Sequence, residues 1–245
     1  MICQSNPIFG EFKTHFLNSP IYQQLINDPA VEVVMVYLTG SYLTGNADCL
    51  SDYDLCVLVA SLPRHLEVYQ RPPMWYMQYT PEGRKCHVVY NDFSNIFKTS
   101  AFPQDNVGWV QFKYITDEHI FYTNPKYQQM IQILLSHKDE ISQNALHLFG
   151  ISCLSALSVQ SVEAITEDLL QKVPKLAYQL VWASGEACGI PVSPDLLIPL
   201  KRQSFVQLPE NAKNQVLTCI KTFAQYIEAY SKSGIIKELE KFYDI

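Results

Sequence analysis

Two aspartates, Asp52 and Asp54, stand immediately before the apolar run 55–59. That run is typical of a buried strand, in which side chains alternate between the two faces, so both carboxylates should share one face with Cα atoms about 6.5–7 Å apart. Both can then reach one hard cation between them. Mg²⁺ prefers oxygen ligands and commonly takes one or two carboxylates together with substrate phosphates. The spacing therefore predicts that Asp52 and Asp54 are metal ligands.

A glycine–serine pair precedes the aspartates, with ten residues between Ser41 and Asp52. The run 31–38 before this pair is rich in β-branched and aromatic residues, so it predicts a buried strand. Gly40 has no Cβ, which allows a sharp turn close to a ligand. A helix that begins near Ser41 would direct unpaired N–H groups at phosphate oxygens, and Gly45 would end it. We therefore expect Gly40 and Ser41 to bind nucleotide phosphate.

Either element alone carries little weight, because Gly-Ser pairs occur in many turns and most Asp-x-Asp pairs are solvated. Here they come in order between two strand-like runs, with Gly45 and Ser51 also in place. Positioning and electrostatic neutralisation supply most of the catalysis of phosphoryl transfer. A phosphate-binding turn followed by two metal ligands therefore indicates transfer of a nucleotidyl group from a nucleoside triphosphate.

The same residues carry a family resemblance. The segments 40–47 (GSYLTGNA) and 51–55 (SDYDL) resemble the signature of the DNA polymerase beta-like nucleotidyltransferase superfamily. Within it, they are most similar to the small bacterial branch of aminoglycoside and minimal nucleotidyltransferases. The resemblance implies an α/β (α+β) fold with a mixed sheet that carries the aspartates and a helix at the Gly-Ser turn. Thr44 departs from the pattern, because many relatives have an arginine there.

The resemblance also implies a role for each matching residue. Gly40 and Ser41 would be nucleotide-binding residues that hold the triphosphate. Asp52 and Asp54 would be catalytic residues that bind Mg²⁺ as the cofactor. The family usually adds a third carboxylate on a later strand, where it acts as general base or as ligand of a second metal.

A histidine stands at the position that resembles the third carboxylate. The runs 75–80 and 86–90 flank the segment 81–84 and predict a hairpin. Beyond the hairpin, Asn91 or Asp92 can cap a helix that runs through 93–97. Counting back from that helix gives His87 as the matching position, with Asp92 nearby at the junction of strand and helix.

This departure leaves three alternatives open. A neutral imidazole can accept a proton or bind a metal, but it brings no negative charge to balance a second cation. His87 can serve as the catalytic base, Asp92 can bend in to serve, or catalysis can be weakened or lost.

Composition narrows the class of partner. The 245 residues are 48% hydrophobic and 17% charged, as in ordinary globular proteins that bury a core. The formal net charge is −6, and the sequence has no basic run of the kind that neutralises a polynucleotide. Arg64 and Arg71 are the nearest basic candidates for phosphate contact. A small-molecule acceptor or a partner protein therefore fits better than nucleic acid.

Cysteine usage and hydropathy indicate the compartment. The seven cysteines are scattered and form no Cys-x-x-Cys pair, which argues for a reducing environment and against a disulfide scaffold or zinc site. The first residues lack a signal-peptide profile, and no apolar stretch approaches the length of a membrane helix. We expect a cytoplasmic protein without a membrane partner.

The periodicity of the chain predicts two domains. Residues 1–136 are expected to form the nucleotidyltransferase domain, which opens with helix signals around 9–27. It ends with a short strand at 119–122 and a helix that starts at Asn124-Pro125. Residues 137–245 show helical spacing throughout and are expected to form an all-helical C-terminal domain. One of its helices should begin at Pro174, since proline is favoured at the first helical position.

The leading functional prediction is an Mg²⁺-dependent enzyme that moves a nucleoside monophosphate from a nucleoside triphosphate to a hydroxyl of a small molecule. One alternative is an antitoxin or regulator that transfers AMP to a partner protein. Another is a catalytically weakened protein that binds nucleotide only. The sequence does not name the acceptor or the preferred base, and we expect a monomer or homodimer.

Overall fold

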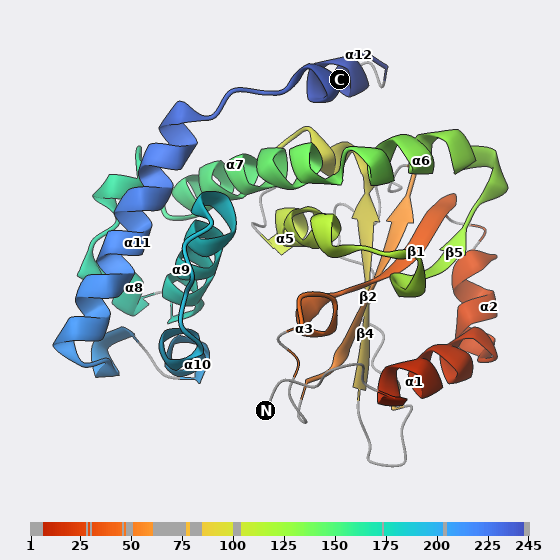
Figure 1. Ribbon diagram of the computed structural model, residues 1–245, viewed down its shortest axis with the longest axis horizontal. Coiled ribbons are helices and arrows are strands. Elements are labelled where there is room, and N and C mark those ends of the chain that lie inside the picture. The colour runs from red at the N-terminus through yellow and green to blue at the C-terminus, as the bar shows by residue number, and fades with distance from the viewer. Residues whose placement is uncertain are drawn as a thin grey trace. The chain divides into compact units, whose positions relative to one another are not determined.

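The computed structural model describes residues 7–27, 29, 31–45, 47, 51–60, 77–78, 85–99, 104–172, 174–202 and 205–242 (Figure 1). The chain forms two compact units. The first comprises residues 1–96, 108–142 and 239–245, and the second comprises residues 97–107 and 143–238. A domain boundary at residue 137 stays a prediction.

The first unit is built on a mixed five-stranded sheet in the order β3-β4-β2-β1-β5. Strand β1 is antiparallel to both β2 and β5, β2 is parallel to β4, and β3 is antiparallel to β4. This arrangement confirms the predicted α/β class with a mixed sheet. The strands are β1 Val33–Thr39, β2 Tyr53–Val59, β3 Met77–Gln78, β4 Lys85–Asp92 and β5 Ile120–Thr123.

The aspartate-bearing strand β2 lies in the middle of the sheet. Its apolar residues are buried from Leu55 to Val59, as expected for a strand that is covered on both faces. The register pairs Asp54 with Thr39 of β1 on one side and with His87 of β4 on the other. Residues that pair across neighbouring strands point to the same face, so the sheet brings Asp54 and His87 together.

The helix signals around 9–27 correspond to two helices, α1 (Pro7–Leu17) and α2 (Pro20–Ile26). The break occurs because Pro20 cannot continue α1 and is favoured at the start of a new helix. Ser19 caps α2, since its side-chain oxygen accepts the Tyr22 N–H at 3.2 Å.

Aromatic side chains cover both faces of the sheet. On one face, the ring of Phe12 from α1 stacks on Tyr53 of β2, with centroids 3.9 Å apart and planes at 6°. Tyr37 of β1 points to the other face and meets the edge of Phe112, with centroids 5.6 Å apart. Asp54 lies on the face of Tyr37, because alternation along β2 places it opposite to Tyr53.

The remaining elements of the first unit connect the strands or follow them in the chain. Asp92 ends β4 and is followed by the 3-10 helix η1 (Phe93–Ile96). Asn124 accepts the Lys126 N–H and so caps the turn that leads into α6, with Pro125 at the first position as its sequence predicts. The other elements are α3 (Gly40–Leu43), η2 (Phe112–Tyr114), η3 (Asp117–His119), η4 (Pro125–Tyr127) and α6 (Gln128–Ser136).

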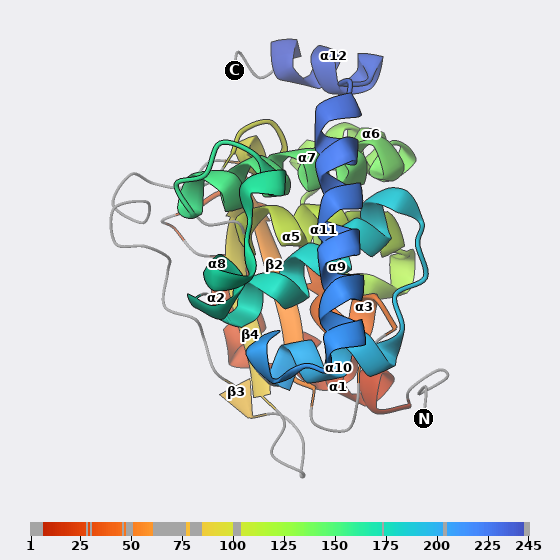
Figure 2. The same cartoon turned by 90° about the vertical axis from the view of Figure 1, so that its left-hand side faces the viewer.

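The second unit is helical in the part that the structure describes (Figure 2). Helix α9 begins at Pro174 as predicted, and it packs against α11. Gly150 of α7 (Lys138–Ala156) permits a close approach to Ile227, because a Cβ at position 150 would lie 2.4 Å from the Ile227 Cδ1 atom. The elements are η5 (Val162–Ala164), α8 (Glu167–Lys172), α9 (Pro174–Cys188), α10 (Pro194–Arg202), η6 (Phe205–Gln207) and α11 (Glu210–Ala229).

Three helices contain residues of both units: α5 (Gln104–Gln111), α7 (Lys138–Ala156) and α12 (Gly234–Phe242). Among the described segments, no helix has both the length and the apolar character that crossing a membrane requires.

Candidate functional site

The two predicted metal ligands lie together with His87, the third predicted catalytic residue. His87 Nδ1 is 3.2 Å from Asp54 Oδ1, and His87 Nε2 is 3.7 Å from Asp52 Oδ2. The side chains of Asp52, Asp54 and His87 are 38%, 33% and 24% exposed, so the cluster is open to solutes. A single imidazole therefore faces both carboxylates.

The residue between the aspartates holds their backbone in place. Tyr53 points to the opposite face, where its ring stacks on Phe12 at 3.9 Å and on Tyr42 of α3 at 4.3 Å. Two rings at these distances must lie on opposite sides of Tyr53. Packing of a fully buried aromatic side chain thus fixes the segment that carries Asp52 and Asp54.

Gly40 turns the chain from β1 into α3 with φ of +73°, a conformation that favours glycine. A Cβ at this position would lie 2.1 Å from Asp54 Oδ2 and 2.9 Å from Asp54 Cγ. The sequence predicts Gly40 as a point of close approach, and in the structure the group that it approaches is the Asp54 carboxylate. Ser41 follows as a half-buried residue of α3.

The single turn of α3 ends as its sequence predicts. Gly45 follows it with φ of +73°. Thr44 caps the turn: its N–H donates to the Gly40 carbonyl at 3.2 Å and its hydroxyl to the same oxygen at 3.3 Å. Thr44 therefore closes the turn through its own backbone and hydroxyl.

Asp92 lies at the other end of β4 from His87. It pairs with Val59 at the end of β2, and its Oδ1 atom accepts the Ser94 N–H at 2.6 Å. Asp92 lies five positions after His87, and five steps along a strand correspond to about 16 Å. Asp92 is 8% exposed and acts as the cap of η1, so the geometry leaves His87 as the residue that faces the aspartates.

The carboxylates influence a neighbouring thiol. Burial, together with the negative charges of Asp54 and Asp52, raises the pKa of Cys86 well above its ordinary value. Cys86 is therefore a neutral thiol at physiological pH and not a nucleophile.

Some predicted features fall outside the described residues. These are Arg64, Arg71 and the hairpin turn 81–84. The two strands that this turn joins are confirmed where they are described, because Met77 pairs with Cys86 in the antiparallel ladder of β3 and β4.

The donor set of the site fits a divalent cation that is shared with a substrate. Asp52 and Asp54 offer exposed carboxylate oxygens on the same side of β2, which are the ligands that Mg²⁺ prefers. In the described part of the chain, no group of three or more His, Cys, Asp or Glu side chains is arranged to hold a metal ion by itself. The residues thus fit an ion that completes its coordination with phosphate and water.

One residue of the site escapes prediction from the sequence. Gln111, the last residue of α5, lies 71 positions from Gly40, and its Oε1 atom accepts the Gly40 N–H at 2.7 Å. No local pattern marks Gln111, since only the packing of α5 on the sheet brings it to the turn.

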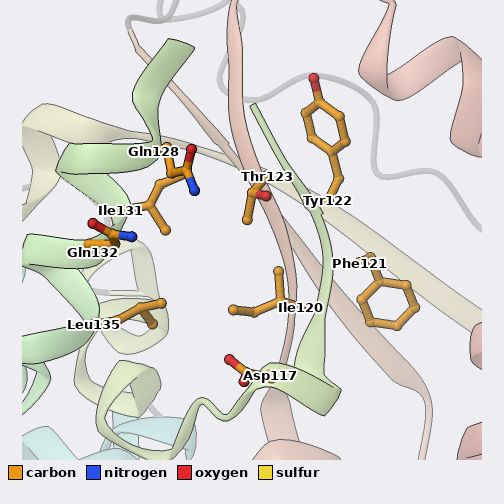
Figure 3. Close-up of a pocket in the computed structure, with 9 residues that line it drawn as sticks. All are labelled: Asp117, Ile120, Phe121, Tyr122, Thr123, Gln128, Ile131, Gln132 and Leu135. Carbon is orange, nitrogen blue, oxygen red and sulfur yellow. The ribbon is translucent and has the colours of Figure 1, made fainter. Parts of the chain in front are cut away.

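A separate pocket of about 370 Å³ lies between β5 and α6 (Figure 3). Ile120 of β5 and Leu135 of α6 point into it from opposite sides, whereas Phe121 and Tyr122 turn away. None of the clustered site residues lines it. Its one carboxylate and lack of a cationic side chain make it unsuited to a triphosphate. The lining residues are Asp117, Ile120, Phe121, Tyr122, Thr123, Gln128, Ile131, Gln132 and Leu135.

Comparison with known families decides the class of domain to which this arrangement belongs. Residues 25–125 match the nucleotidyltransferase domain family. The nucleotidyltransferase domain spans less than half of the chain but includes the Gly-Ser turn, both aspartates and His87. The match implies nucleotidyl transfer and leaves the substrate undefined. No curated protein matches the chain.

Proposed function

We propose that this protein is an Mg²⁺-dependent enzyme that transfers a nucleoside monophosphate from a nucleoside triphosphate to a hydroxyl of a small molecule. The observation that carries the proposal is the cluster of Asp52, Asp54 and His87 beside the Gly40 turn, within a matched nucleotidyltransferase domain. Each group in the cluster has a distinct role in the proposed reaction.

Asp52 and Asp54 hold the cation, and Gly40 with Ser41 forms the turn against which the triphosphate lies. When bound, the divalent ion neutralises phosphate charge and makes the α-phosphorus easier to attack. The two aspartates are held by the buried ring between them, so little rearrangement is needed when substrate binds.

His87 accepts the proton of the attacking hydroxyl. An ionised Asp54 only accepts hydrogen bonds, so the 3.2 Å contact places the imidazole proton on Nδ1 and leaves the Nε2 lone pair available. The hydroxyl oxygen forms a bond to the α-phosphorus, the bond from that phosphorus to the bridging oxygen breaks, and pyrophosphate leaves. The hydroxyl proton passes to Nε2, and Asp54 and Asp52 stabilise the resulting imidazolium.

The acceptor is proposed to be a small molecule because of charge. The net charge of −6 and the absence of a basic run from the sequence disfavour a polynucleotide acceptor. Transfer of AMP to a partner protein uses the same chemistry. The labelling experiment described below distinguishes a protein acceptor from a small-molecule acceptor.

A second candidate function is nucleotide binding without transfer. It is favoured by the replacement of the expected third carboxylate by His87, which supplies no negative charge for a second cation. Asp92 does not compensate, because it caps η1 at the far end of β4.

The first experiment measures binding of each nucleoside triphosphate with Mg²⁺ by titration calorimetry on the full chain. Asp52→Ala should weaken binding by at least about tenfold, because it removes one of two anionic ligands. Asp139→Ala, which removes an exposed carboxylate of α7, is the matched control and should bind like the unmodified protein. Equal affinity in the Asp52 variant would count against the proposal.

The second experiment supplies a nucleoside triphosphate labelled at the α-phosphate, together with a cell extract divided by size into a small-molecule fraction and a protein fraction. It measures pyrophosphate release and the transfer of label to each fraction. Label in the small fraction supports a small-molecule acceptor, and label in the protein fraction supports the partner-protein alternative. His87→Ala should lower the rate by about 10²–10⁴, the usual contribution of a general base. Tight binding of the nucleoside triphosphate, with no pyrophosphate released in the presence of either fraction, supports the second candidate function.

A further inference from the structure

Gln111 has an amide whose orientation is fixed by the Gly40 turn. Its Oε1 atom accepts the Gly40 N–H at 2.7 Å, and only the oxygen of an amide can accept from an N–H group. The Nε2 atom, with its two hydrogens, must therefore occupy the other branch of the amide. The turn thus has a fixed pair of additional N–H donors beside it.

These donors have no partner within the described part of the chain. The side chain of Gln111 is only 9% exposed, and polar groups at this depth are normally hydrogen-bonded. Among the described residues, the polar side-chain atoms that are both unpaired and fully buried do not include Nε2 of Gln111. This unpaired nitrogen is therefore in contact with solvent. It is a buried donor that a solute can reach.

The position of the amide indicates which solute it would bind. Gly40 separates the amide of Gln111 from the Asp54 carboxylate, which a Cβ on Gly40 would meet at 2.1 Å. The hydroxyl of Thr44, another donor of this turn, is already engaged with backbone carbonyls. A ligand whose metal is bound at Asp54 would lie on the Gly40 turn, beside the Gln111 amide. To pair with the unused N–H groups of that amide, the ligand needs oxygen atoms that accept hydrogen bonds.

We propose that Gln111 is a triphosphate-binding residue, whose Nε2 atom donates to a phosphate oxygen while Oε1 holds the Gly40 peptide. The inference rests on the proposed function, because it assumes that a polyphosphate occupies the turn. It assigns a ligand contact to Gln111, which is far in sequence from the Gly-Ser turn and the aspartates. It also explains why only the oxygen of this buried amide has a hydrogen-bond partner in the described part of the chain.

A purely structural role would also require Oε1, so the test must separate the two ends of the amide. Gln111→Glu keeps an oxygen acceptor for the Gly40 N–H but replaces the NH₂ group by a second oxygen, which repels phosphate. Gln129→Glu makes the same change at an exposed position of α6 and is the matched control. Gln111→Met, which adds no charge, is the second variant if the glutamate variant does not fold.

The probes are Mn²⁺ alone, followed by electron paramagnetic resonance, and inorganic tripolyphosphate with Mg²⁺, followed by calorimetry. Gln111→Glu should weaken tripolyphosphate binding by about tenfold or more, since the hydrogen bond to the anion is lost and the added carboxylate repels it. The same variant should bind Mn²⁺ as tightly as the unmodified protein or more tightly, because the added charge attracts a cation. Gln111→Met should weaken tripolyphosphate binding and leave Mn²⁺ affinity within about twofold.

Three results would overturn the inference. In the first, Gln111→Glu binds tripolyphosphate like the Gln129→Glu control. In the second, the variants lose Mn²⁺ and tripolyphosphate affinity together, which shows that the residue only positions Gly40 and Asp54. In the third, the unmodified protein binds no tripolyphosphate and Asp52→Ala does not change Mn²⁺ binding. That last result refutes the proposed function itself and is distinguished from the first two by its effect on the unmodified protein.

Discussion

Substitution of Gly40 by alanine is expected to move the Asp54 carboxylate, and a second glycine offers a control with the same backbone conformation. Gly40 and Gly45 both have φ of +73°. A Cβ on Gly40 would lie 2.1 Å from Asp54 Oδ2 and 3.0 Å from Asp54 Cβ, whereas a Cβ on Gly45 would meet nothing within 4 Å. The two variants thus share backbone strain and differ in the steric clash.

The expected free energies of unfolding follow from these contacts. Placing a Cβ in the left-handed region costs about 1–2 kcal/mol, which is the whole effect expected for Gly45→Ala. Gly40→Ala adds a clash that the structure must relieve, and overpacking typically costs about 1–3 kcal/mol more. The side chain of Asp54 can rotate away, so a large part of the damage should appear as lost metal binding.

The assay combines urea unfolding with titration of Mn²⁺ and of Mg²⁺ with ATP. Gly40→Ala should lose at least about tenfold in affinity for both, and Gly45→Ala should bind like the unmodified protein. A double-mutant cycle sharpens the test. In an Asp54→Ala background most of the clashing atoms are absent. The loss in free energy of unfolding caused by Gly40→Ala should then fall towards the loss caused by Gly45→Ala.

Two outcomes would refute this reasoning. The first is metal affinity in Gly40→Ala equal to that in Gly45→Ala. The second is an additive cycle, in which Gly40→Ala costs the same whether residue 54 is aspartate or alanine. Either would mean that the close approach of the turn to the carboxylate has no energetic consequence.

Three further predictions concern stability, each measured by urea unfolding. Gly150→Ala should cost about 1–3 kcal/mol because its Cβ would meet the Ile227 side chain, and unchanged stability would contradict this. Phe12→Ala should cost about 3–5 kcal/mol, since the ring stacked on Tyr53 is lost, and a cost below that of a surface substitution would be inconsistent with the stack. Burial lowers the pKa of His147, so the unfolded chain binds more protons and stability falls as pH drops below about 6.5. His147→Gln should reduce that loss, and identical pH profiles for both proteins would exclude this source.

Local sequence predicts the parts of the fold whose causes are local. The apolar runs before Gly40 and after Asp54 give β1 and β2, and Pro174 marks the start of α9, because period, turn chemistry and proline act over a few residues. The helix signals around 9–27 are local as well, and Pro20 divides that segment into α1 and α2 because proline is favoured at the start of a new helix.

Features that depend on packing between distant segments could not be read from the sequence. The contact of His87 with both carboxylates requires the parallel register of β2 and β4, which no local pattern specifies. Gln111 reaches Gly40 across 71 positions, and a glutamine at the end of a helix has no distinguishing spacing. The sequence indicates the groups that could do chemistry, and tertiary structure determines how close they come.

Under the proposed function, the ring of Tyr53, packed between Phe12 and Tyr42, would affect how tightly Asp52 and Asp54 bind a cation. Because the backbone on either side is already immobilised in the free protein, an arriving ion does not have to order it, and less conformational entropy is lost on association. A homologue with a small aliphatic residue in place of Tyr53 would retain both aspartates and still bind the ion more weakly. In the proposed site, affinity for the ion would therefore depend partly on packing at the opposite face of the sheet.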